Sequence, residues 1–332
     1  MKKRKRILPV ILVLFLLSSV VWALLAGNDA ISPKDVLMVL AGKIHDMRQV
    51  IVYQVRIPRV LAAAAAGAAL SVSGFLLQSN LDNALASPGI LGINNGAGLF
   101  VLLSACLFPY QSEVKCIAAF MGALTVTLLV YILTLKTGLS KTSVVLSGVA
   151  VSALCTSVID VILSLKPEVA ADKVAFQIGG FGSLNSSVVY FAVPVILVGL
   201  VTAVFLAPSL DLLLLGDDVA FGLGQNVRRF RVLNILCAAL LSGAAVSMCG
   251  ILGFVGLIVP NVVRMLHPGK SRGGVVYCMI LGAAFLLVCD TLSRTVVFPY
   301  ELPCGLFLSL LGAPFLVWML IRRRKKLGIQ GE

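Results

Sequence analysis

Long apolar stretches without a single charged residue recur along the whole chain. Only 12% of the 332 residues are charged, whereas 59% are hydrophobic. Soluble domains usually carry about twice that share of charge. Charge this sparse excludes a disordered chain, a coiled coil and an ordinary soluble enzyme. Since a bilayer core of about 30 Å is crossed by about 20 apolar helical residues, we expect an all-α polytopic membrane protein.

The positions of these stretches predict ten transmembrane helices. Eight are expected as single stretches, at residues 7–26, 60–81, from 92 onward, 116–135, 142–159, 185–210, 273–289 and 302–321. The stretch 232–263 is too long for one helix, and its glycines together with Pro260 should break it into a helix and a shorter partner. Stretches 87–98 and 250–256 should be non-helical inside protein or along a cavity, because open backbone facing lipid is costly.

Basic residues are concentrated in two tails that directly adjoin apolar stretches. Ten of the 27 lysines and arginines lie at residues 2–6 and 322–326. Cytoplasmic flanks of membrane helices are rich in lysine and arginine, so both termini should be cytoplasmic, which requires an even number of spans. A nucleic-acid patch is the alternative for such clusters, but their place beside apolar stretches favours membrane lipids as neighbours and no nucleic acid. The stretch 7–26 is longer than the apolar core of a signal peptide, so we expect a retained helix.

An internal repeat is predicted from two similar octets. Residues 67–74 and 243–250 match at an offset of 176, and a broken segment follows each. On the span count one helix runs inward and the other outward, which is typical of inverted-repeat transporters. The predicted halves are about 56–165 and 228–321 (helices 2–5 and 7–10) within one permease domain, 1–332. Small residues also recur wherever membrane helices pack closely, and that is the alternative.

Neither a nucleotide site nor a catalytic site is predicted. The segment 268–271 resembles the end of a P-loop, but Arg264 stands where its first glycine is needed. The eight cysteines form no CxxC pair and only two histidines are present, so we expect no metal site, no disulfide framework and no cofactor. Among acidic residues near the spans, Asp160 and Asp290 lie at span ends, and Asp290 can pair with Arg294 four residues later. Because so few acidic residues lie within the predicted spans, we favour an energy source outside this chain. The alternative is an ion-coupled secondary transporter with inverted repeats.

The longest cytoplasmic loop, residues 209–231, offers a place where such a source can act. Its stretch 215–224 predicts a short helix with Asp217 and Asp218 in the first turn. Gly222 and Gly224 should end that helix. The helix is either a plain connector or the part on which a cytosolic motor acts.

Five motifs in chain order resemble the permease family of ABC importers for iron-siderophores, haem and cobalamin. They are Arg56, Pro58 and Arg59; Gln78 with Asn83, Ala86, Pro88, Leu91, Gly92 and Gly96; the stretch 215–224; Gly253, Gly256, Pro260 and Arg264; and Glu301, Pro303 and Gly305 with 311–314. The departures are Ala84 for a usual proline, Asn261 for a frequent histidine, and Leu308 for a common threonine.

The resemblance implies a transport subunit without an ATPase site in the bacterial inner (plasma) membrane. Its implied partners are two cytosolic ABC ATPase subunits, a second permease copy or paralogue, and an extracytoplasmic substrate-binding protein. Implied ATPase-coupling residues are Gly216, Asp217, Asp218, Ala220, Gly222 and Gly224. Docking of the binding protein is implied for Arg56, Arg59 and Arg294, although a helix-end arginine is an equal interpretation of Arg59. The implied pathway and gate residues are Gln78, Asn83, Pro88, Gly89, Asn94, Asn95, Thr142 and Ser143, the last two being alternatively a plain N-cap.

Overall fold

A computed structural model describes residues 2–27, 32–44, 46–137, 140–182, 184–297 and 300–326. Regular structure in these ranges is helical throughout. The α-helices are α1 (Lys2–Leu25), α2 (Pro33–Leu40), α3 (Met47–Val50), α4 (Ile57–Asn80), α5 (Ile93–Leu107), α6 (Ser112–Thr137), α7 (Lys141–Leu165), α8 (Ala170–Ile178), α9 (Ser186–Leu213), α10 (Asp217–Gly222), α11 (Val227–Cys249), α12 (Val255–Leu266), α13 (Ser271–Thr295) and α14 (Cys304–Lys326). A π-helical segment (Ile51–Arg56) joins α3 to α4, and a 3₁₀ turn (Pro167–Val169) precedes α8.

The expected all-α polytopic membrane fold is confirmed. Seven helical segments of the described chain are long and apolar enough to cross a membrane: α1, the run from α3 through α4, α6, α7, α9, α11 and α13. The other three expected spans are the shorter apolar helices α5, α12 and α14. The number of ten crossings therefore stays a prediction. Both basic tails continue the first and last helices instead of forming separate segments.

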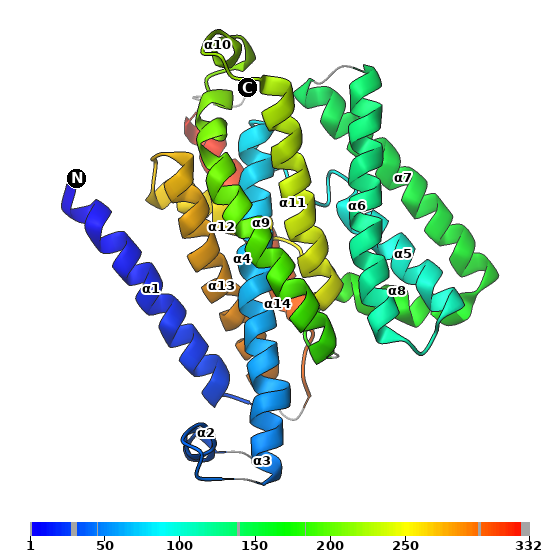
Figure 1. The fold of residues 1–332 in the computed structure, drawn as a ribbon, viewed down its shortest axis with the longest axis vertical. Helices are drawn as coiled ribbons and strands as arrows, with labels where there is room; N and C mark the ends of the chain where they lie inside the picture. The colour runs from blue at the N-terminus through cyan, green and yellow to red at the C-terminus, as the bar shows by residue number, and fades with distance from the viewer. Residues whose placement is uncertain are drawn as a thin grey trace.

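Helix α4 occupies the middle of the molecule, with α9, α11 and α13 packed around it and α1 on the outside (Figure 1). Small residues make this burial possible. A Cβ on Gly67 would collide with the carbonyl oxygen of Gly282 on α13, and a Cβ on Gly74 with that of Gly256 on α12. Membrane helices approach each other this closely only where side chains are small. The alanine- and glycine-rich stretch of α4 therefore makes it the buried centre of the fold.

The two ends of the molecule carry different elements. Figure 1 shows α10 at the top, where α11 begins and α9 ends, and α2 and α3 at the bottom. Helix α8 lies on the lower side of the group formed by α5 to α8. We call the end that carries α10 the α10 end, and the opposite end, toward which α2, α3 and α8 lie, the α8 end. Helix α4 runs toward the α10 end and α11 away from it.

Both expected helix breaks are present, one displaced along the chain and the other shorter than predicted. Residues 81–92 form turns, but α5 already begins at Ile93, so the expectation of non-helical backbone over 93–98 was wrong. Gly92 has a left-handed φ of +76° directly before the helix, and the glycines that follow are tolerated inside a buried membrane helix. The second break covers residues 250–254, and α12 begins at Val255, so the expectation of non-helical backbone at 255 and 256 was wrong.

The packing of the two predicted repeat halves is reciprocal. Helix α4, the first of one half, packs along α13, the third of the other half. Helix α11 packs along α6 in the corresponding way. An inverted repeat would produce this exchange, although its boundaries stay a prediction.

Candidate coupling surface and interior cavity

The short helix α10 and its flanking glycines form a segment at one end of the molecule. Gly216 precedes the helix with φ +103°, and Gly224 follows it with φ +81°. Residues with a Cβ rarely adopt such angles, so glycine is required at both turns. All six residues expected to couple to ATPases lie in this segment: Gly216, Asp217, Asp218, Ala220, Gly222 and Gly224.

This segment is held to the helices on both sides of it. The guanidinium Nη2 of Arg231 on α11 donates to Asp217 Oδ1 at 2.7 Å. The Arg231 side chain is 2% exposed, whereas that of Asp217 is 45% exposed. Gln225 Nε2 donates to the carbonyl oxygen of Ser209 on α9 at 3.1 Å, and Ala220 is fully buried. The position of α10 is therefore set by α9 and α11 together.

The outer side of the segment presents apolar side chains. We call the exposed set the α10 surface; it consists of Leu214, Leu215, Val219, Phe221 and Leu223. Phe221 is 76% exposed, and a Cβ on Gly222 would meet nothing within 4 Å. A cavity of about 740 Å³ adjoins Phe221 and is lined elsewhere by Ser140 and Arg228. Clustered apolar side chains exposed on a helix outside the bundle mark a contact surface for a protein or a membrane.

The predicted pathway residues do not come together in one site. Gln78 is buried, and its Nε2 donates to the carbonyl oxygen of Gly256 at 3.0 Å. Asn83 is exposed and its Oδ1 accepts from the backbone N–H of Leu85 at 3.0 Å. Gln78 thus ties α4 to the second helix break, while Asn83 shapes the turn after α4.

The remaining pathway residues lie around the start of α5. Pro88 is buried, while Gly89 and Asn94 are half-buried. Asn95 Nδ2 donates to Thr156 Oγ1 of α7 at 3.3 Å. The Asn95 contact ties the start of α5 to α7, and the pathway role stays a prediction for all four residues.

The two predicted gate residues lie in the first turn of α7. Thr142 is exposed and Ser143 is half-buried. The N-cap is Ser140, whose Oγ accepts from the Ser143 backbone N–H at 3.0 Å. The alternative that Thr142 or Ser143 caps the helix was therefore wrong, because the cap lies two residues before Thr142 and three before Ser143. Their gate role is untested.

The three arginines expected to dock a binding protein are buried at the α8 end. Arg59 Nη2 lies 3.0 Å from Asp290 Oδ1, and Arg59 Nη1 lies 2.9 Å from Glu301 Oε2. Arg294 Nε lies 3.3 Å from Asp290 Oδ2, which confirms the predicted pair along α13. We call Arg59, Asp290, Arg294 and Glu301 the charge cluster. Glu301 is its accessible member, with a side chain 40% exposed.

Two of these arginines also hold the end of α1. Arg294 Nη2 donates to the carbonyl oxygen of Ala23 at 3.2 Å, and Arg56 Nη1 donates to that of Leu24 at 3.1 Å. The last carbonyls of a helix lack partners within the helix, and cations near them are favourable. The role that the contacts show for Arg56 and Arg294 is attachment of α1; docking stays a prediction.

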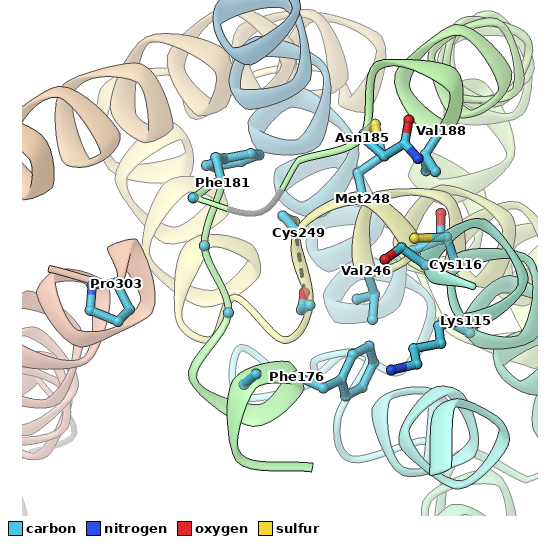
Figure 2. A pocket seen from close by; sticks show the side chains of 18 of the residues that line it. Lys115, Cys116, Phe176, Phe181, Asn185, Val188, Val246, Met248, Cys249 and Pro303 are labelled. Atoms are coloured by element: carbon cyan, nitrogen blue, oxygen red, sulfur yellow. Dashed lines mark hydrogen bonds between the residues drawn. The ribbon is translucent and has the colours of Figure 1, made fainter. Parts of the chain in front are cut away.

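A cavity of about 480 Å³ opens beside the charge cluster, between α6, α8, α11 and the start of α14. Figure 2 shows its walls, with the Lys115 side chain reaching from α6 toward the ring of Phe176 on α8. Lys115 Nζ lies 2.6 Å from Asp172 Oδ1. Arg59 and Glu301 also line the cavity. Sequence reasoning missed Lys115 and Asp172, since nothing in the sequence links residues 57 positions apart on two helices.

Comparisons with known proteins agree over nearly the whole chain. The model of the FecCD transport family matches residues 11–322. The Fe(3+)-citrate import system permease protein YfmE of Bacillus subtilis is 33% identical, covering 96% of both chains. The hemin transport system permease protein HmuU of Yersinia pestis is 35% identical, covering 82% of this chain and 83% of that one. A solved structure, described as an inward-facing conformation of a metal-chelate type ABC transporter, is 25% identical with a TM-score of 0.82, covering 94% of this chain and 97% of its own.

Proposed function

The chain belongs to the FecCD transport family as a permease subunit of an ABC import system, and we propose that it carries an iron chelate or related metal macrocycle inward across the bacterial plasma membrane. Its relatives are named for ferric citrate and hemin. The described helices supply a multi-pass bundle for that task. Partner ATPases supply the energy for transport, since permeases of this family have no ATPase site of their own.

We propose that the α10 surface binds the ATPase subunits. The observation that carries this role is a short helix outside the bundle that exposes Val219 and Phe221. Its own Ala220 is buried, and its Asp217 pairs with buried Arg231 of α11. Because the helix is firmly attached, a movement of a partner bound to its apolar side chains can be transmitted to α9 and α11. The glycines at 216, 222 and 224 leave the surface open for close approach.

The orientation follows from the same role. We propose that the α10 end is cytoplasmic, with both termini on that side. Exposed Arg228, Arg229, Lys270 and Arg272 lie in loops or helix starts at this end, as expected for cytoplasmic flanks. The α8 end then faces outward and receives the substrate-binding protein.

Docking at the outer end is proposed to involve the region of Arg56, Arg59 and Arg294, as predicted. Because these side chains are buried and bonded in this conformation, an acidic partner reaches Arg59 only if Glu301 releases it. The exposed lysines Lys34 and Lys43 provide further cations at this end. A second permease copy or paralogue would complete the path between two subunits.

ATP-driven uptake by the reconstituted complex tests the proposal. We expect Phe221→Asp to weaken ATPase association and ATP-dependent iron uptake by about tenfold or more, since aromatic anchors dominate interfaces. Tyr110→Asp is the matched control, because Tyr110 is an exposed aromatic residue beyond α5, 97% exposed. It should leave ATPase association unchanged. Uptake that needs no ATPase and follows a proton or sodium gradient would overturn the proposal in favour of a secondary carrier.

A further inference from the structure

In both ion pairs that line the cavity at the α8 end, the cation is less exposed than the carboxylate. The Arg59 side chain is 10% exposed and its partner Glu301 is 40% exposed. The Lys115 side chain is 20% exposed and its partner Asp172 is 35% exposed. In each pair the cation therefore lies deeper and the carboxylate lies nearer to solvent. An incoming carboxylate would meet the carboxylate positions first.

The remaining walls suit an organic molecule. Phe176, Phe181, Val188 and Met248 line the cavity together with the two cations (Figure 2). A volume of about 480 Å³ falls within the range of about 300–1,000 Å³ typical of ligand sites. Mostly apolar walls with a few charged groups are the usual composition of such sites.

We propose that this cavity receives a carboxylate-bearing iron chelate, whose carboxylates replace Glu301 on Arg59 and Asp172 on Lys115. The proposal rests on the proposed import function and names the substrate class at its outer end. No covalent bond changes in the exchange: two protein carboxylates move into solvent as two ligand carboxylates take their hydrogen bonds. Asp290 keeps its contact with Arg59 throughout, so Arg59 stays in position.

The iron is expected to keep its own ligands in this cavity. Three cysteines, Cys116, Cys249 and Cys304, line it. Within the described residues, however, no three His, Cys, Asp or Glu side chains are arranged to hold a metal ion. Recognition would therefore act on the charge of the chelate, and a neutral chelate should not depend on these ion pairs.

Equilibrium binding to the chain in nanodiscs without ATPase tests the site, with radiolabelled ferric citrate as the anionic probe. We expect Glu301→Gln and Asp172→Asn to bind ferric citrate several-fold more tightly, because each removes a competing carboxylate. Lys115→Gln should weaken binding about tenfold, and Lys115→Arg should largely restore it. A purely structural role for the pairs would not produce tighter binding.

Lys173→Gln is the matched control. Lys173 pairs with Asp160 at 3.6 Å and its side chain is 23% exposed, similar to Lys115. It does not line the cavity, so ferric citrate binding should not change. A neutral ferric trihydroxamate should bind equally to all variants.

Three results would overturn the proposal: no binding of ferric citrate to the parent chain, unchanged binding in Glu301→Gln and Lys115→Gln, or variants that alter retention of phosphatidylglycerol while leaving ferric citrate binding unchanged. The last would assign the cations to a lipid headgroup. Because no ATPase is present, each result is independent of the uptake experiment. Intact ATP-driven uptake with unaltered binding would reject the cavity alone and leave the import function standing.

Discussion

The two ends of the molecule use arginine–carboxylate pairs in opposite ways. At the α10 end, buried Arg231 holds one half-exposed carboxylate, Asp217, between two left-handed glycines. At the α8 end, the Asp290 side chain is 3% exposed and lies between two buried guanidinium groups, those of Arg59 and Arg294. The first pair attaches a small surface helix, whereas the second joins α4 to α13.

This difference predicts which end of the molecule tolerates the loss of an ion pair. A buried charge that loses its partner is strongly destabilising, while an exposed partner can be replaced by water at little cost. The α8 end should therefore be sensitive to the loss of Asp290, whereas the α10 end should tolerate the loss of Asp217. The following substitutions test that contrast, beginning with the largest expected effect.

Asp290→Asn should cost about 3–5 kcal/mol of the free energy of unfolding, because buried Arg294 loses its carboxylate partner and Arg59 keeps only half-exposed Glu301. Thermal unfolding of the detergent-solubilised protein, followed by circular dichroism, measures the loss. Glu301→Gln is the control at the same cluster and should cost less than about 1 kcal/mol, since Glu301 is half-exposed. Equal losses in the two variants would contradict a difference between buried and exposed members.

Gly74→Ala should cost about 1–3 kcal/mol, because its Cβ would collide with the Gly256 carbonyl oxygen between α4 and α12. Gly222→Ala in the α10 segment should leave stability unchanged, since its Cβ meets nothing within 4 Å. The midpoints of unfolding of both variants, compared with the parent chain, give the result. A loss in Gly222→Ala as large as in Gly74→Ala would show that the α10 segment is as tightly packed as the core.

Asp217→Asn should cost about 1 kcal/mol or less in global stability, because the removed carboxylate is 45% exposed. Its effect should instead be local, with faster amide hydrogen exchange in α10 than in the parent chain. Asp218→Asn is a suitable control, since Asp218 is exposed in the same turn. Unchanged exchange in Asp217→Asn would mean that Ala220 and Gln225 alone hold the helix.

The smallest effect is expected at Asp35, which belongs to an exposed capping box at the start of α2. Hydrogen bonds from the Ser32 hydroxyl and backbone N–H lower the pKa of Asp35 below its ordinary value of 3.8. The capping contribution should therefore be complete above that value and be lost as the pH falls through the lowered pKa. A carboxyl-carbon NMR titration checks this, and Ser32→Ala should return the pKa toward 3.8. A midpoint that Ser32→Ala leaves in place would assign the shift to Arg48, whose Nη1 lies 2.8 Å from Asp35 Oδ1.

Much of the fold and the coupling segment could be predicted because both depend on local signals. The α10 helix needed only two acidic residues after Gly216 and two glycines to end it. The predicted Asp290–Arg294 pair needed only the four-residue spacing of one helix. The expectation of non-helical backbone over 93–98 was wrong, because glycine and asparagine break helices in water and are tolerated where neighbouring helices cover them.

The sequence by itself determined that the chain crosses a membrane many times, that its breaks fall after α4 and α11, and that its motifs are those of a transport family. Hydrophobic length and helix-ending residues act over a few turns, so they can be inferred without a fold. Only the tertiary structure decided that Arg59 and Arg294 share Asp290 in the interior, and that Lys115 and Asp172 face one cavity with Glu301. These contacts join residues far apart in the chain. Their energies depend on how deeply the side chains are buried, and only the packing of whole helices determines that burial.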